Sequence, residues 1–272
     1  MIDIIKSPAK INLVLDLLYK RIDGFHEIDT IMAKIELFDE IKVSFSQELK
    51  VITSNGIRQQ DNFVYKALKE LEKLTKSNFE LCFSIEKNIP MGAGLAGGSS
   101  NAGVCLSYVS KKYNIDIDKC LEVGEKVGSD INFFIFDHNF ARCTGKGEII
   151  IPFDVNLDYD VLLFFPDIHS DTPSVYKEFN IKDKPGLNVS KVILDIQNTQ
   201  KNIQKDLFNC LEYPAFKLYP DLNDIYDKIR KVYPDIRMSG SGSTFFTLIK
   251  KNDSVKYTDD DIFIKRVDLI KG

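Results

Sequence analysis

The densest group of glycines in this chain lies within residues 90–103, in the stretch PMGAGLAGGSSNAG. Glycine loses more conformational freedom on folding than any other residue, so such a run indicates a backbone that something must approach closely. An alternating apolar stretch precedes the run and an amphipathic helical pattern follows it. The free N–H groups and the dipole of a helix N-terminus attract anions, phosphate in particular. The run therefore predicts a phosphate-binding loop; a tight turn would need only one or two glycines.

Two well-known phosphate motifs are poor matches for this stretch. A Walker A loop is excluded, because no Gly-Lys-Ser/Thr sequence follows the glycines. Gly92, Gly94 and Gly97 match the G-x-G-x-x-G spacing of dinucleotide-binding proteins. That fingerprint requires a strand that runs straight into the turn and an acidic residue at the end of the next strand, about 20 residues on. Here Pro90 interrupts the strand, so an NAD-linked oxidoreductase is the weaker alternative.

Asp130 stands out among the charged residues by its context, and Lys10 is the second candidate. Phosphoryl transfer to a hydroxyl requires neutralised phosphates, an in-line hydroxyl and a group that accepts its proton. Asp130 stands in VGSDINFFIF, between a helix end and an apolar run, and its alternative role is to cap a helix that begins at Ile131. Lys10 begins a strand and shares a face with Asn12, although a lone lysine at a strand edge is usually solvated.

Aromatic residues and a histidine form a second candidate group. The stretch DGFHE places Phe25 and His26 beside an Asp-Gly turn, and TPSVYKEF contains Tyr176. Phenylalanine and tyrosine number 19 and 11 in this chain, so an isolated aromatic residue is usually part of a core. His26, between Phe25 and Glu27, is less easily explained in that way. His138 and His169 receive no assignment.

The first half of the chain predicts strands and then helices around the glycine run. Residues 9–17 alternate, with one face made of Lys10, Asn12 and Val14 and the other of Ile11, Leu13 and Leu15. Residues 26–46 predict further strand with polar turns, and residues 79–87 predict another strand. Helical spacing covers residues 61–74, about 99–113 and 118–127, with Gly128 ending the last helix. Residues 139–153 predict a hairpin.

After Pro152 the pattern restarts. A buried strand is predicted at 159–165, helices at 188–203 and 222–232, and strands at 243–249 and 261–269. This mixture indicates an α+β protein with two lobes, residues 1–152 and 153–272.

Composition limits the class of protein. The 272 residues are 44% hydrophobic and 28% charged, enough for a sizeable core. A net charge of −4 argues against nucleic-acid binding. The five cysteines are scattered and predict neither a disulfide framework nor a zinc site. No signal peptide is recognisable and no apolar run approaches the ~18 residues of a membrane span, so we expect a cytoplasmic protein that does not bind a membrane. No feature of the sequence predicts an oligomeric state.

The glycine run resembles the ATP-binding motif of the GHMP small-molecule kinases, P-x-x-x-G-L-(small)-(small)-S-S. Residues 238–246, MSGSGSTFF, resemble a second glycine loop of that family, and residues 7–17, SPAKINLVLDL, resemble its first motif. Three motifs in this order are far more specific than one. The resemblance implies an ATP- and Mg²⁺-dependent kinase with a ribosomal-protein-S5-like N-terminal lobe and a ferredoxin-like α/β C-terminal lobe.

The resemblance also implies roles for individual residues. Asp130, in a G-(A/S)-D-x-x-F-F context, would be the catalytic base, and Lys10 would lie beside it and the acceptor hydroxyl. Ser99 or Ser100 could supply a hydroxyl to phosphate or to Mg²⁺, with Ser100 a candidate ligand, and the sequence does not choose between them. ATP would be bound by Pro90, Met91, Gly92, Ala93, Gly94, Leu95, Ala96, Gly97, Gly98, Ser99, Ser100, Gly240, Ser241 and Gly242.

The segment KRIDGFHEI, together with the glycine run, is most similar to members that phosphorylate a cytidine-diphosphate-linked polyol of the non-mevalonate isoprenoid pathway. By that resemblance Phe25 and Tyr176 would stack on cytosine, His26 would hydrogen bond to the base, and Asn12 would contact the substrate.

This chain departs from the usual family pattern at three positions. Ala96 stands where glycine is usual, Phe25 where tyrosine is usual, and Asn132 where proline is common. The alternatives are a GHMP kinase for mevalonate-type substrates or homoserine, and a non-catalytic RNA-binding protein. The aromatic group argues against the former, because those substrates carry no base, and the acidic charge argues against the latter.

Overall fold

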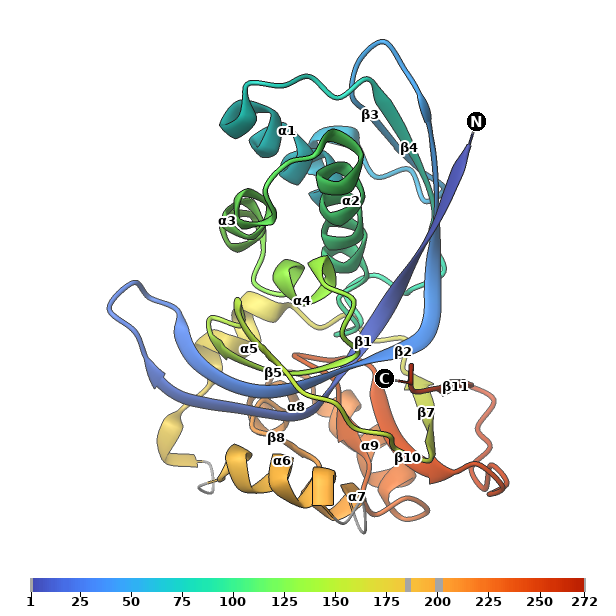
Figure 1. Ribbon diagram of the computed structural model, residues 1–272. Coiled ribbons are helices and arrows are strands. Elements are labelled where there is room, and N and C mark those ends of the chain that lie inside the picture. Colours follow the sequence, from blue (N-terminus) through green and yellow to red (C-terminus); the bar gives the residue numbers. More distant parts are fainter. Residues whose placement is uncertain (1, 184–186, 199–202, 272) are drawn as a thin grey trace.

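Two long antiparallel strands run through the molecule and connect its two ends (Figure 1). The computed structural model describes residues 2–183, 187–198 and 203–271. In it, β1 (Asp3–Lys20) pairs with β2 (His26–Phe45) over nearly its whole length. The polar turns predicted within residues 26–46 are wrong, because β2 is continuous. Its polar side chains are accommodated by partners instead, as where Arg142 binds Asp29 through two hydrogen bonds of 2.7 Å.

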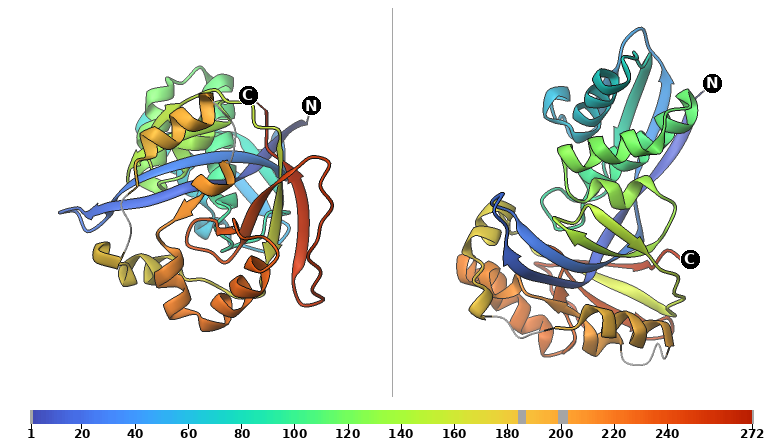
Figure 2. Two further views of the ribbon diagram at one scale, coloured as in Figure 1. Left: turned by 90° about the horizontal axis from the view of Figure 1, so that it is seen from below. Right: turned by 60° about the vertical axis from the view of Figure 1, so that its left-hand side comes forward.

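Three helices cover one face of the sheet at the N-terminal end (Figures 1 and 2). The strands there are β3 (Lys50–Thr53) and β4 (Leu81–Glu86), and the helices are α1 (Phe63–Thr75), α2 (Gly97–Tyr113) and α3 (Ile117–Val127). The predicted helices are confirmed, with starts that differ by one or two residues. Their apolar faces pack on the sheet through side chains such as Leu68, Phe83 and Val109. Gly128 ends α3, as predicted.

The other half of β2 pairs with β5 (Phe140–Gly145), and β5 pairs with β6 (Ile149–Pro152), which confirms the hairpin. The short helix α4 (Ile131–Ile135) precedes β5. On the opposite edge, β8 (Phe208–Asn209) pairs in parallel with β1. Together β1–β6 and β8 form a seven-stranded sheet.

A second sheet occupies the C-terminal end. It has the strand order β11-β7-β10-β9, with all pairs antiparallel. Its strands are β7 (Tyr159–Phe165), β9 (Arg237–Met238), β10 (Phe245–Lys250) and β11 (Phe263–Asp268). The helices are α5 (Thr172–Glu178), α6 (Val189–Asn198), α7 (Ile203–Asp206), α8 (Glu212–Leu218) and α9 (Pro220–Arg230), and 3₁₀ turns lie at Gln59–Asp61 and Ile181–Asp183. The single helix predicted over 188–203 corresponds to α6 and the start of α7, and its residues 199–202 lie outside the described ranges.

The observed α+β architecture agrees with the predicted class. One buried cluster contains both Ile11 of β1 and Leu163 of β7, so the two sheets share a core. The lobe boundary near residue 152 stays a prediction. Within the described ranges, no helix is both long and apolar enough to cross a membrane.

The face assignments predicted for residues 9–17 hold for Leu13, which packs in the same cluster as Ile11, and are wrong for Val14 and Leu15. The pairing of β1 with β2 shifts register between Asn12 and Val14. A bulge of this kind reverses the faces that follow it. Val14 consequently packs in the same cluster as Ile11, while Leu15 lines the cavity that contains Lys10 and Asn12.

Candidate active site

A cavity of about 1060 Å³ collects most of the candidate residues. Its walls are formed by β1, the turn at residues 128–130, the start of α5 and two glycine-rich loops. We call residues 90–100 the first glycine loop and residues 239–243 the second glycine loop.

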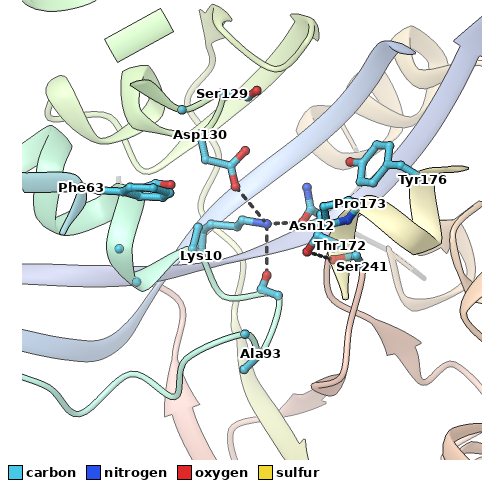
Figure 3. Close-up of a pocket in the computed structure, with 18 of the residues that line it drawn as sticks. Lys10, Asn12, Phe63, Ala93, Ser129, Asp130, Thr172, Pro173, Tyr176 and Ser241 are labelled. Atoms are coloured by element: carbon cyan, nitrogen blue, oxygen red, sulfur yellow. Dashed lines mark hydrogen bonds and ion pairs between the residues drawn. The ribbon is translucent and has the colours of Figure 1, made fainter. Parts of the chain in front are cut away.

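Lys10 and Asp130 meet in this cavity (Figure 3). The Lys10 Nζ lies 3.6 Å from Asp130 Oδ2 and donates to Asn12 Oδ1 at 2.5 Å and to the Gly94 carbonyl at 3.1 Å. The Lys10 side chain is 4% exposed and that of Asp130 is 29% exposed. A buried ammonium is therefore held by three oxygens, while the carboxylate next to it remains open to the cavity.

Asn12 fixes the position of the lysine. Its Nδ2 donates to Thr30 Oγ1 at 2.8 Å, and Thr30 Oγ1 donates to the Val14 carbonyl at 2.5 Å. These two hydrogen bonds set the orientation of the Asn12 amide, because Thr30 Oγ1 already donates its proton to Val14 and can only accept from Nδ2. The Asn12 oxygen is thus directed at Lys10.

The proposed helix-capping role of Asp130 is only half right. Asp130 does precede α4, but its side chain makes no capping hydrogen bond. Its carboxylate is instead paired with Lys10 across the cavity. The residue is therefore available to a molecule bound there.

The two glycine loops touch each other through their backbones. The Ser239 hydroxyl donates to the Gly94 carbonyl at 3.0 Å, the same oxygen that accepts from Lys10. Gly94 has φ +74°, and a Cβ on it would lie 2.0 Å from the Ser239 carbonyl oxygen. Only glycine allows this approach. The loops form one continuous wall beside the Lys10–Asp130 pair.

Not every residue predicted in the loops faces the cavity. Leu95 is buried in the core, and Gly242 lies against Met238 and Ser170. Ser100, predicted as a candidate Mg²⁺ ligand, is wholly buried, and its hydroxyl shares a 2.7 Å hydrogen bond with Ser7. The loop residues that line the cavity are Pro90, Met91, Gly92, Ala93, Gly94, Ala96, Gly97, Gly98, Ser99, Gly240 and Ser241.

Part of the cavity wall next to the first glycine loop was not predicted from the sequence. Asn62, Phe63 and Lys87 line it there. The side chain of Lys87 is 8% exposed and is paired with Asp39, whose other oxygen accepts from the N–H groups of Asn88 and Ile89. Phe63 is 39% exposed and is the first residue of α1. A large apolar side chain at the start of a helix is the sequence feature that could have pointed to this part of the wall.

The aromatic group closes the opposite end of the cavity. The His26 ring lies 6.0 Å from that of Tyr176 and 5.7 Å from that of Phe179, measured between centroids. Phe25 is 55% exposed, and the Lys146 ammonium lies 5.4 Å from its ring centre. Burial lowers the pKa of His26, and nearby Lys20 lowers it further, so its neutral form is favoured at pH 7. A neutral imidazole can both donate and accept hydrogen bonds.

A hydrogen bond joins this end to the second glycine loop. Thr172 Oγ1 lies 2.7 Å from Ser241 Oγ, and Thr172 begins α5, the helix that carries Tyr176 (Figure 3). His138 lies outside the cavity, and burial next to Lys34 lowers its pKa to about 4. His169 also lies outside it, against the far side of Gly92.

Two family models match parts of the chain. Residues 62–138 match the family model for the GHMP kinases N terminal domain, and residues 193–256 match that for the GHMP kinases C terminal domain. The chain is 36% identical over 255 residues to a 4-diphosphocytidyl-2-C-methyl-D-erythritol kinase of Sulfurihydrogenibium sp., covering 90% of this chain and 91% of that protein. A kinase of the same name from Geobacillus sp. is 34% identical, with 93% and 90% covered.

The chain belongs to the 4-diphosphocytidyl-2-C-methyl-D-erythritol kinase family. A crystal structure of 4-(cytidine 5'-diphospho)-2C-methyl-D-erythritol kinase superposes with a TM-score of 0.76 at 31% identity, covering 90% of each chain. A homoserine kinase from Cytophaga hutchinsonii has a TM-score of 0.67 at 12% identity, covering 92% of this chain and 86% of its own, and so shares the fold alone.

Two departures from this kinase family have structural consequences. Ala96 adopts φ +56° and ψ +29°, a left-handed conformation that is unfavourable for alanine. Asn132 is buried, and its Oδ1 has no hydrogen-bond partner and sits over Gly124, where a Cβ would lie 2.0 Å away.

Proposed function

We propose that this protein transfers the γ-phosphoryl group of ATP to the 2-hydroxyl of 4-diphosphocytidyl-2-C-methyl-D-erythritol, a step of the non-mevalonate isoprenoid pathway. The observation that carries the proposal is the Lys10–Asp130 pair, which lies between the glycine loops and the aromatic group in one cavity. In this proposal the phosphates of ATP lie along the two glycine loops, and the cytosine lies between Phe25 and Tyr176.

In the proposed reaction, the Asp130 carboxylate accepts the proton of the substrate hydroxyl. The hydroxyl oxygen forms its bond to the γ-phosphorus as the bond to the ADP oxygen breaks. Lys10 stabilises the negative charge on the entering oxygen and on Asp130. Because Lys10 is already held by Asn12 and Gly94, little reorganisation is needed when the substrate binds.

The residues around the first glycine loop suit a Mg²⁺ ion that accompanies ATP. Asn101 is buried in the first turns of α2 and lines the cavity, and its Oδ1 has no hydrogen-bond partner. Ser99 lines the cavity on the same stretch, which makes its hydroxyl a better candidate than that of Ser100. Magnesium usually takes one or two protein oxygens together with water and phosphate oxygens. Bound there, it would neutralise phosphate charge.

The base end of the cavity supports a cytidine compound. Stacking of a base on an aromatic ring contributes about 1–3 kcal/mol. The neutral His26 would hydrogen bond to the base edge, and its contacts with Tyr176 and Phe179 hold the ring in place. A mevalonate or homoserine substrate would leave this end of the cavity unused.

The proposal is tested by measuring ADP release with Mg·ATP and the cytidine-diphospho-methylerythritol substrate, with mevalonate, homoserine and galactose as parallel acceptors. We expect turnover with the cytidine compound alone, and its loss in Asp130→Asn. Turnover with another acceptor alone would retain the kinase and eliminate the base-binding assignment. A folded protein that binds no ATP would overturn the proposal entirely.

A further inference from the structure

The second glycine loop and the residue before it form hydrogen bonds with two side chains that do not line the cavity. Asn209, at the end of β8, is 4% exposed. Its Nδ2 donates to the carbonyls of Met238 and Gly240, both at 2.7 Å. Its Oδ1 accepts from the Leu211 N–H at 2.8 Å, so the amide cannot turn its oxygen toward the loop without losing all three bonds.

Glu212 completes the attachment. Its Oε1 accepts from the Met238 N–H at 2.8 Å. Both backbone groups of Met238, the residue that precedes the loop, are therefore bound by side chains of residues 209–212. Burial raises the pKa of Glu212 to about 7, against the opposing positive charge of Arg237, so the carboxylate is largely ionised at pH 8.

The same segment is attached to the strand that carries Lys10. Asn209 is paired with Leu15 of β1, and the Cys210 N–H donates to the Leu15 carbonyl at 3.0 Å. On the cavity side, a Cβ on Gly240 would lie 3.5 Å from Lys10 Nζ, so the loop backbone borders the ammonium. Residues 209–212 thus connect β1 with the loop over a short path.

We propose that Asn209 and Glu212 are positioning residues that fix the second glycine loop relative to β1 for binding of ATP. This inference rests on the proposed placement of the phosphates between the two loops. Without the Asn209 amide, two buried carbonyls would lose their donor, and the loop would shift to satisfy them elsewhere. Such a shift directly alters the wall beside Lys10, and it reaches the base end through the hydrogen bond between Thr172 and Ser241, so we expect the larger effect at the phosphate end.

The test compares the binding of two probes by calorimetry at pH 8. Asn209→Asp keeps the size and the oxygen that accepts from Leu211, but it replaces the donor with an oxygen that repels both carbonyls. We expect the dissociation constant of Mg·ATP to rise about ten-fold or more, as the loss of two buried hydrogen bonds implies, while that of CDP rises much less. Asn252→Asp, on an exposed turn, is the matched control. Glu212→Gln keeps an acceptor for Met238 and should weaken ATP binding less than Glu212→Leu.

The outcomes separate this inference from the proposed function. Wild-type protein that binds Mg·ATP, with Asn209→Asp binding equally well, overturns the inference alone. Equal weakening of both probes in Asn209→Asp means a general loss of structure and also overturns it. Wild-type protein that binds no Mg·ATP overturns both. If Asn209→Asp does not fold, the comparison of Glu212→Gln with Glu212→Leu tests the inference. Equal ATP affinity in these two variants contradicts a role for the hydrogen bond between Glu212 and the Met238 N–H.

Discussion

The two ends of the cavity are built in different ways. At the phosphate end, backbone groups and buried charges bind one another, as where the Gly94 carbonyl accepts from both Lys10 and Ser239. At the base end, side chains stand side by side with few mutual bonds, and Phe25 is more than half exposed. A change at the phosphate end therefore disturbs several contacts at once, whereas one at the base end removes a single surface.

This difference suggests a division of labour. In the proposed reaction the phosphate end holds the phosphates of ATP, and rigid backbone contacts suit that purpose. The base end would distinguish one acceptor from another, and we expect that separate side chains can be exchanged there without loss of the fold. Substitutions at the two ends test whether loss of catalysis and of stability is confined to the phosphate end and loss of substrate choice to the base end.

The largest effect is expected where the phosphate end performs chemistry. Asp130→Ala removes the proposed proton acceptor, and Lys10→Ala removes the cation beside it. A general base contributes about 10²–10⁴-fold, so kcat should fall by that order in Asp130→Ala while ATP still binds. Rapid-quench or ADP-release kinetics measure kcat, and calorimetry measures binding. The exposed Asp137→Ala is the control, and a near-normal kcat in Asp130→Ala would remove that residue from the mechanism.

The next effect concerns the contact between the loops. Gly94→Ala would place a Cβ 2.0 Å from the Ser239 carbonyl oxygen, in addition to the strain of φ +74°. We expect a loss of several kcal/mol in the free energy of unfolding, together with loss of ATP binding. Gly56→Ala is a matched control, because Gly56 has φ +73° and nothing within 4 Å of the added Cβ. If urea unfolding shows equal losses in the two variants, strain alone explains the effect and the loops are not in essential contact.

The phosphate end was also the more predictable from sequence. The glycine runs are recognisable from their composition, whereas Lys10 and Asp130 were given their roles by the family resemblance. The bulge after Asn12 was not predictable, since alternation carries no sign of an extra residue and Leu15 reached the cavity only through that bulge. The continuity of β2 was missed for a related reason, because its polar residues are balanced by partners distant in sequence, such as Arg142 for Asp29.

Long-range hydrogen bonds account for what else the sequence did not reveal. Ser99 and Ser100 are adjacent and alike, and only the Ser7 contact tells which hydroxyl is buried. The role of Asn209 depends on bonds that span 29 and 31 positions of the chain. Neither feature leaves a local pattern of spacing or polarity.

A smaller effect is expected at the base end, and it should be confined to one substrate. Tyr176→Leu and Phe25→Leu each remove an aromatic face from the proposed sandwich. Loss of about 1–3 kcal/mol of stacking would raise KM for the cytidine substrate roughly 5- to 150-fold, and KM for ATP should stay unchanged. Steady-state kinetics with each substrate varied in turn provide the measurement. Tyr213→Leu, on the exposed side of α8, is the control, and a parallel rise in KM for ATP would contradict the separation of the two ends.

The smallest expected effect lies within the phosphate end and tests how far folding and chemistry are joined there. Ala96 holds a left-handed conformation that costs alanine about 1–2 kcal/mol, and glycine adopts it freely. Ala96→Gly should raise the free energy of unfolding by at most about 1 kcal/mol, since the added freedom of the unfolded chain offsets part of the gain. Lys76→Gly, at φ +53° after α1, relieves a similar strain far from the phosphates and serves as the control in urea unfolding. If both variants gain stability and only Ala96→Gly alters KM for ATP, the loop conformation itself governs phosphate binding. If KM is unchanged in both, alanine has already set the loop correctly, and the strain at Ala96 has no functional consequence.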